Sequence, residues 1–334
     1  MATLPIIGRQ VQFGIAKEAT RGSAESSADF FIPWSELSID DKDDKVLDDM
    51  AIGVVEESAG ETIVKQWAEG SISGPITDKA FALILNAICG TLSSGANADG
   101  SGLVYDHTIT VAQSIQPQSL TYFLNDPSAT SNAQDYVYAL GMISSLEIRY
   151  EQGKFITFSA TLRSKKGVQT AVTPATNVEN RFIDKHVVFK LATNLAGLGA
   201  ASPITIRSFT LTFDRMIEDD MVLGSVAPND FLSKGFSVSG SLEARWESEA
   251  TFKTAALAGT AKALRIDLQN TDVTIGTGEN PGLTIDLAKV VFSAPGRTYS
   301  LGDVVAQTLE FKAHYSVSDS KLLTILATNL QASY

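Results

Sequence analysis

The sequence predicts a mainly β protein made of two similar halves, each with several strands and one short helix. Three observations lead to this prediction. Apolar and polar residues alternate with the period of two that is typical of a sheet with one apolar and one solvated face. Two other segments have the end signals of short helices, and several phrases occur twice, about half a chain apart. The alternating segments are 145–151, 155–163, 208–214, 236–247 and 308–317.

The segment SLEIRYE (145–151) shows the alternation in its simplest form. Leu146, Ile148 and Tyr150 fall on one face, and the polar and charged residues between them fall on the other. The other four segments repeat this pattern, mainly with serine, threonine and charged residues on the polar face. Antiparallel sheets that are packed on one side have this pattern. We therefore expect sheets whose second face stays in contact with water.

The two helical segments are 77–90 and 247–260. In the first, Thr77 or Asp78 is the expected N-cap and Gly90 the expected C-cap, whereas the second ends at Gly259. Each helix would lie against the apolar side of a sheet.

The repeated phrases indicate an internal duplication. They are DDMAIG and DDMVLG from Asp48 and Asp219, SISG and SVSG at 71–74 and 237–240, and CGT and AGT from Cys89 and Ala258. Their offsets are 171, 166 and 169 residues, and their order along the two halves is the same. We predict a first domain at 1–170 and a second domain at 171–334, with the boundary inside 164–182.

The negative charge of the chain is concentrated in two segments. The 334 residues carry a formal net charge of −12. Residues 36–61 contain ten acids and two lysines (2 − 10 = −8), and residues 214–230 contain five acids and one arginine (1 − 5 = −4). This balance disfavours tight binding of nucleic acid, because lysine and arginine must neutralise its phosphates. The two segments could be solvated loops, calcium ligands, or contacts with a basic surface of another subunit.

The sequence offers no catalytic, cofactor or metal site. Its three histidines lie far apart, and we expect His107 and His314 to be half-exposed strand residues. The single cysteine, Cys89, lies in an apolar run and should be buried. No phosphate-binding loop, dinucleotide fingerprint or nucleophile elbow is present. Because these catalytic patterns are missing, we expect a non-enzymatic protein. The sequence shows neither a signal peptide nor an apolar run long enough to span a membrane, so we expect the protein to fold in a cytoplasm.

Four segments resemble the tail tube (major tail) proteins of long-tailed bacteriophages. They are GRQVQFGIAKEATRGSA (8–24), FFIPWSELSIDDK (30–42), KQWAEGSISGPITDKAFALILNAICG (65–90) and SLEIRYEQGKFITFSATLRSKKG (145–167). The resemblance implies a β-sandwich-like fold with a flanking helix in each half. It also implies rings whose inner strands join into one β-barrel, stacked into a tube that conducts the phage genome. Most such rings contain six single-domain subunits, and the duplication favours three copies with pseudo-sixfold symmetry.

Two sets of residues receive roles from this resemblance. The segments 40–61 and 214–234 are expected to contact the next ring, with the methionines as adaptable apolar contacts and the glycines permitting the turn. Their key residues are Asp48, Asp49, Met50, Gly53, Asp219, Asp220, Met221 and Gly224. The lumen candidates, which could instead form the outer solvated face, are Ser71, Ser73, Glu147, Arg149, Ser237, Ser239, Glu243, Thr308, Glu310 and Lys312.

The expected partners follow from the same resemblance. They are other copies of the chain, in the same ring and in stacked rings, together with tape-measure, terminator and distal tail proteins. DNA would pass through the lumen without specific binding, and no membrane, cofactor or metal is expected. The protein would be assembled in the host cytoplasm and located in the virion tail. The alternatives are another ring or surface component of a phage tail (terminator, baseplate or decoration protein) and a carbohydrate-binding β-sandwich.

Overall fold

The computed structural model describes residues 7–127, 134–245, 252–293, 296–298, 301 and 305–334. The fold is mainly β, as the alternation predicts. The strands of the first half are β1 (Gln12–Lys17), β2 (Phe30–Ile32), β3 (Glu36–Asp48), β4 (Gly60–Pro75), β5 (Gly90–Ala96), β6 (Tyr105–Val111), β7 (Leu120–Asn125), β8 (Tyr136–Glu151), β9 (Thr157–Ser164) and β10 (Val168–Gln169). Those of the second half are β11 (Val187–Ala192), β12 (Pro203–Ile204), β13 (Ile206–Asp220), β14 (Asp230–Arg245), β15 (Lys262–Gln269), β16 (Gly282–Phe292), β17 (Gly296–Thr298), β18 (Ala306–Ala313) and β19 (Leu323–Asn329).

In the described part of the chain, two short α-helices accompany these strands. α1 (Ala80–Cys89) is buried along its whole length and ends at Gly90, whose φ of 98° is the left-handed conformation expected of a C-cap. Its N-cap is Lys79, without a side-chain bond, so the prediction of Thr77 or Asp78 was wrong. Asp78 instead accepts hydrogen bonds from the main chain and side chain of Asn180. α2 (Lys253–Leu257) is shorter than expected, and residues 247–251 of that prediction lie outside the described residues.

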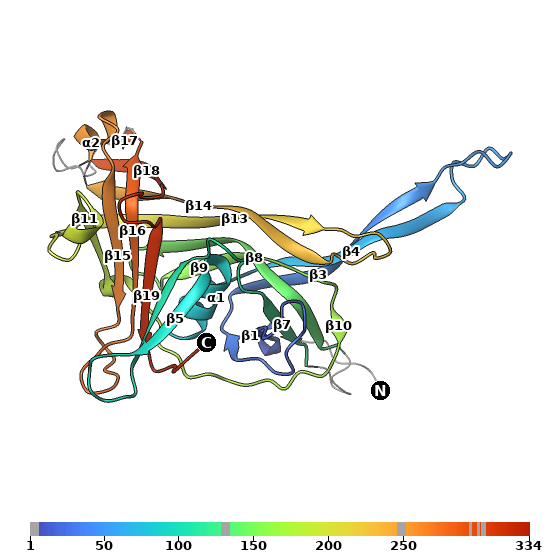
Figure 1. The fold of residues 1–334 in the computed structure, drawn as a ribbon, viewed down its shortest axis with the longest axis horizontal. Coiled ribbons are helices and arrows are strands. Elements are labelled where there is room, and N and C mark those ends of the chain that lie inside the picture. The colour runs from blue at the N-terminus through green and yellow to red at the C-terminus, as the bar shows by residue number, and fades with distance from the viewer. Residues whose placement is uncertain (1–6, 128–133, 246–251, 294–295, 299–300, 302–304) are drawn as a thin grey trace.

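A central antiparallel sheet runs through both halves in the order β3, β4, β9, β8, β13, β14 and β18. The two halves join where Ser145–Glu151 of β8 pairs with Ser208–Asp214 of β13. Figure 1 shows these long strands lying side by side, with the β3–β4 hairpin extending far beyond the rest of the molecule. β15, β16 and β19 cross the end of the sheet that belongs to the second half.

The apolar face of the central sheet is covered by the remaining elements. In the first half these are α1 and the layer β2, β1, β7, β8 and β10, since β8 takes part in both layers. The ring of Phe81 in α1 lies 5.3 Å from that of Phe158 in β9, centroid to centroid. In the second half the corresponding layer is β12, β11, β15, β16 and β19. One continuous apolar core includes residues of both halves.

The two halves use the same strand pairings. Seven pairings of the first half have a counterpart in the second: β1–β2 and β11–β12, β1–β7 and β11–β15, β7–β8 and β15–β16, β8–β9 and β16–β18, β3–β4 and β13–β14, β4–β9 and β14–β18, and β8–β10 and β16–β19. β5 and β6 have no counterpart among the described residues of the second half.

The registers of the two hairpins also correspond. Glu36 pairs with Ser73 as Ser208 pairs with Glu243, and Asp48 pairs with Gly60 as Asp220 pairs with Asp230. A bulge interrupts both hairpins at the same step, after the pairs Asp44–Lys65 and Met216–Gly235.

This register changes the sequence alignment of the two halves. Gly70 corresponds to Gly240, whereas the matched phrases had placed Ser71 opposite Ser237. A Cβ atom at Gly70 would stand 1.9 Å from the Ser38 carbonyl oxygen, and one at Gly240 would stand 2.4 Å from the Thr210 carbonyl oxygen. Both glycines therefore permit the same close approach of the first hairpin strand.

Candidate functional site

The solvated face of the central sheet consists of continuous rows of polar residues. One row crosses all seven strands as Glu36, Ser73, Ser159, Glu147, Thr212, Ser239 and Lys312. The row beside it contains Ser38, Ser71, Thr161, Ser145, Asp214 and Ser237. On the other side lie Thr157, Arg149, Thr210, Ser241 and Glu310, followed by Glu151, Ser208, Glu243 and Thr308.

All ten lumen candidates lie in these four rows, on one face of one sheet. The residues between them in sequence, such as Ile72, Leu242 and Leu309, are buried on the opposite face. The alternation therefore places the candidates on a common surface. This surface is continuous between the two halves of the chain, because residues of β8 pair directly with residues of β13.

This polar face is rich in acids. With the adjoining row of Asp40, Glu69 and Arg163, the rows contain eight carboxylates and three cations. The carboxylates are Glu36, Asp40, Glu69, Glu147, Glu151, Asp214, Glu243 and Glu310. Arg149 contacts Glu147 at 2.7 Å, and Arg207, in the bulge at the start of β13, lies 3.7 Å from Glu243. Lys312 is exposed and has no ion-pair partner in the described part of the chain.

The two acidic segments are long hairpins rather than loops. We call residues 44–65 the first arm and residues 216–235 the second arm. The strands continue to Asp48 and Asp220, and they resume at Gly60 and Asp230. The sequence does not reveal these strands, because the first arm projects into water and the strands of the second arm bury only Phe231, so neither arm shows regular alternation. Gly53 and Gly224 have φ angles of 86° and 88° in the two turns.

The second arm is docked on the first half of its own chain. The Asp219 carboxylate lies 2.5 Å from the Lys65 ammonium and 2.6 Å from the Arg163 guanidinium. Nearer the tip, Arg21 contacts Asp230 at 2.8 Å, and the Gln66 amide donates to the Val226 carbonyl at 2.7 Å. Desolvation opposes ionisation of Asp219, but the hydrogen bonds and charges of Lys65 and Arg163 outweigh it and lower the pKa of this carboxyl.

Apolar contacts support these ion pairs. The Phe231 side chain is fully buried with Leu140 and Met142, and Trp67 and Ile217 pack against this cluster. Phe231 pairs directly with Asp219, so both residues meet the first half on the same side of the arm. One alternative for the acidic segment 214–230 is a contact with a basic surface of another subunit. In the structure, the basic side chains that it contacts, Lys65, Arg163 and Arg21, belong to the same chain.

Beyond Lys65 at its base, the first arm has no such support from the described residues. At the positions of Asp219 and Phe231 it carries Leu47 and Glu61, which also pair directly and are both exposed. Eight of its large apolar side chains are exposed to solvent: Val46, Leu47, Met50, Ile52, Val54, Val55, Ile63 and Val64. An apolar surface of this extent on a projecting hairpin is typical of a protein contact.

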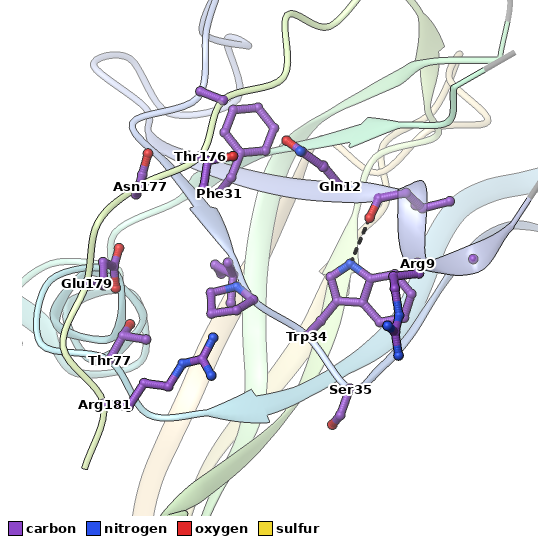
Figure 2. Close-up of a pocket in the computed structure, with 15 residues that line it drawn as sticks. Arg9, Gln12, Phe31, Trp34, Ser35, Thr77, Thr176, Asn177, Glu179 and Arg181 are labelled. Carbon is purple, nitrogen blue, oxygen red and sulfur yellow. Dashed lines mark hydrogen bonds between the residues drawn. The ribbon is translucent and has the colours of Figure 1, made fainter.

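The chain also has a cavity of about 690 Å³ beside β2 (Figure 2). Arg9, Gln12, Glu179 and Arg181 line it, and the Trp34 indole donates to the Val11 carbonyl at 3.1 Å. Burial raises the pKa of Glu179 despite a hydrogen bond from the Ala80 amide. Among the described residues that line it there is no histidine, no cysteine and no carboxylate besides Glu179.

The histidines and acids form no metal centre in the described residues. His107 is fully buried, contrary to expectation, because β6 lies between β5 and β19; its ring contacts Ser94 and Asn329. Cys89 is buried as expected, and desolvation raises the pKa of its thiol to about 12. Among the residues that the structure describes, no helix is long and apolar enough to cross a membrane.

The sequence was compared with known proteins and matches one protein family. No curated protein matches the sequence. The family model of phage tail tube proteins matches residues 8–313, which is most of the 334-residue chain. The mainly β fold agrees with this match. The chain therefore belongs to the phage tail tube protein family, and it is a structural protein of the virion tail.

Proposed function

We propose that this protein forms rings of three copies, which stack into the tail tube and conduct DNA into the host. The observation that carries this proposal is the central sheet. It continues through both halves of the chain from β3 to β18, and the short strand β17 extends it by pairing with the beginning of β18. β3 and β17 each have an open edge within the described residues. Open edges favour pairing with another chain, and closure into a barrel removes them.

The count of three copies rests on an internal duplication of the chain. The seven corresponding pairings and the common bulge of the hairpins support two equivalent tube domains, 1–170 and 171–334. Three chains would then contribute six similar sheets to one barrel. Because the apolar core is continuous, the two domains would enter the ring as one unit.

The polar face would be the wall of the channel. α1 and the outer layers cover the opposite face, so the polar rows are the surface that a closed barrel could present to water and DNA. With eight carboxylates and three cations in those rows, phosphates would be repelled or weakly held. Such a wall would let DNA slide without being trapped.

The tips of the two arms, residues 49–59 and 221–229, would contact the next ring. Met50 and Met221 are 74% and 39% exposed, so both are available as adaptable apolar contacts. The acids Asp48, Asp49 and Asp220 stand at the bases of these tips, and Gly53 and Gly224 form the turns. Tape-measure, terminator and distal tail proteins would bind the same tube, assembled in the host cytoplasm.

Electron microscopy of the purified chain tests this function. We expect long tubes, and single rings that show three subunits with six similar lobes when viewed end-on. Replacing residues 49–59 by Asn-Gly should leave a folded chain, judged by circular dichroism, and single rings without tubes. Normal tubes from this variant would exclude the stacking role. A chain that never forms tubes, alone or with a tape-measure protein, would instead be a terminator, baseplate or decoration component.

A further inference from the structure

The contact between the two halves of one chain provides a template for the contact between two copies. Within the chain, the second half is joined to the first by the pairing of β13 with β8 and by the docked second arm. We propose that the same two contacts recur between neighbouring copies, with β3 of one copy on β17 of the next and Glu61 of the first arm on Lys312. This inference rests on the proposed ring assembly.

The edge of β17 corresponds to the part of β8 that holds β13. Glu147–Arg149 of β8 pairs with Thr157–Ser159 of β9, as Gly296–Thr298 of β17 pairs with Ala306–Thr308 of β18. On its other side β8 holds β13. The corresponding side of β17 carries no strand in the described part of the chain. The open edge of β17 is therefore where the next hairpin would continue the sheet.

The internal junction also fixes the register. Thr212 pairs with Glu147 and Thr210 pairs with Arg149. The hairpin registers match Thr212 with Asp40 and Thr210 with Ser38. Asp40 of one copy would therefore lie opposite Gly296 of the next, and Ser38 opposite Thr298. In this register Asp40 and Ser38 extend the polar rows across the junction.

The docked arm identifies the second contact. Arg163 of β9 pairs with Glu69 of β4, and Lys312 of β18 pairs with Ser239 of β14. Because Glu69 and Ser239 are corresponding positions of the two hairpins, Lys312 of the second half corresponds to Arg163 of the first. Arg163 holds Asp219 of the second arm, whereas Lys312 holds no carboxylate in the described part of the chain. An arm that crosses Lys312 in the same way would bring its own carboxylate to that ammonium.

The first arm carries the required chemistry on exchanged strands. In the second arm the carboxylate, Asp219, lies on the outgoing strand and the apolar Phe231 on the returning strand. In the first arm the apolar Leu47 lies on the outgoing strand and the carboxylate, Glu61, on the returning strand. Directly paired side chains lie on the same face about 5 Å apart, so the exchange preserves one carboxylate and one apolar group on that face.

The receiving surface matches this pair. Val291 of β16 pairs with Lys312 of β18, as Met142 of β8 pairs with Arg163 of β9. Val291 therefore corresponds to Met142, which is buried in one cluster with Phe231 of the docked second arm. Leu47 of the incoming arm would pack on Val291, and Glu61 would contact Lys312. Glu61 is free to do so, because its neighbour Lys45 lies 3.6 Å away in an exposed, weak ion pair.

Disulfide crosslinking of assembled rings tests this contact. Cys89 is buried, so introduced cysteines can be followed against a low background. The double variant Glu61→Cys/Lys312→Cys should give covalent dimers and closed trimers on a non-reducing gel. Glu57→Cys/Lys312→Cys, with its first cysteine in the tip, should give at least tenfold fewer. Asp219→Cys/Arg163→Cys should crosslink within one chain and serves as the positive control.

The outcomes separate this inference from the proposed function. Absence of rings from the unmodified chain counts against ring assembly itself. Rings of the Glu61→Cys/Lys312→Cys variant without crosslinks between copies overturn the docking contact and leave ring assembly intact. If that variant forms no rings, variants with reversed charges at Glu61 and Lys312 test the contact instead. Glu61→Lys or Lys312→Glu alone should lower ring yield severalfold and the combination should restore it, whereas failure of the combination to restore rings overturns the contact.

Discussion

The two arms have the same register but different surroundings. Both leave the central sheet after a bulge at the same step, and both end their strands at a pair beside the tip. The second arm lies on the first half of its own chain, where Asp219 and Phe231 are held, whereas the first arm projects alone (Figure 1). A hairpin of this design is docked where a neighbouring half is present. In the proposed ring, the half that receives the first arm belongs to another copy.

The largest expected difference between the arms concerns their apolar contacts. Phe231→Ala should lower the free energy of unfolding by about 3–4 kcal/mol, because it empties a buried site beside Leu140 and Met142. The corresponding change on the first arm, Glu61→Ala, should stay within about 0.5 kcal/mol in the unassembled chain. Urea denaturation of the two variants measures both values. Equal effects would show that the arms are supported alike.

Loss of the ion pairs should have a smaller effect. Asp219→Asn removes the carboxylate that Lys65 and Arg163 share, and hydrogen bonds to charged groups contribute about 1.5–3 kcal/mol. Because all three side chains are partly solvated, we expect a loss near 1.5 kcal/mol, together with faster proteolysis at 221–229. Asp48→Asn on the first arm should change neither quantity. If Asp219→Asn is cleaved at 221–229 no faster than the unmodified chain, the ion pairs do not hold the second arm and Phe231 alone does.

Acid should release the second arm and leave the first arm as it is. The pKa of Asp219 is lowered in the folded chain, so its contribution is complete above the ordinary aspartate value near 4 and is lost as the pH falls through the lowered value. Hydrogen exchange at Gln66, whose amide donates to Val226, should accelerate below about pH 4 after correction for intrinsic rates. A corrected exchange rate at Gln66 that stays constant throughout the acid range would contradict this account. Asp219→Asn should show no such transition.

The smallest expected effect concerns the turn glycines. Gly224→Ala should cost about 1 kcal/mol, because alanine disfavours the left-handed conformation at φ 88°. Gly53→Ala should cost less in the unassembled chain, since its tip can change conformation without breaking a docked contact. Thermal denaturation compares the two variants. A larger loss for Gly53 would indicate an interaction of the first tip that a single chain does not show.

Much of the fold could be predicted from the sequence, because alternation reports burial on one face. The strands containing Leu146, Ile148 and Leu309 and the buried helix ending at Gly90 follow from such patterns. The sequence predicts loops for the arms because the strands of the first arm bury no face and those of the second arm bury only Phe231, so neither arm shows the alternation. The alignment of Ser71 with Ser237 was off by four residues, since bulges and loop lengths leave no mark in short phrases.

The candidate site was predicted in part for the same physical reason. The ten lumen candidates share one face because a strand has a period of two, and this local rule holds along every strand of the central sheet. The partners of Asp219 were missed, because Lys65 and Arg163 are brought to it by tertiary packing rather than by sequence spacing. Lys312 looked like any other polar strand residue, and its significance appears only through its correspondence with Arg163.

The central claim is that one chain contains two equivalent tube domains, joined by a contact that copies repeat around a ring. Native mass spectrometry of a single closed ring tests this claim most directly. The account predicts three chains of 35.6 kDa in each ring. A ring of six full-length chains would contradict it.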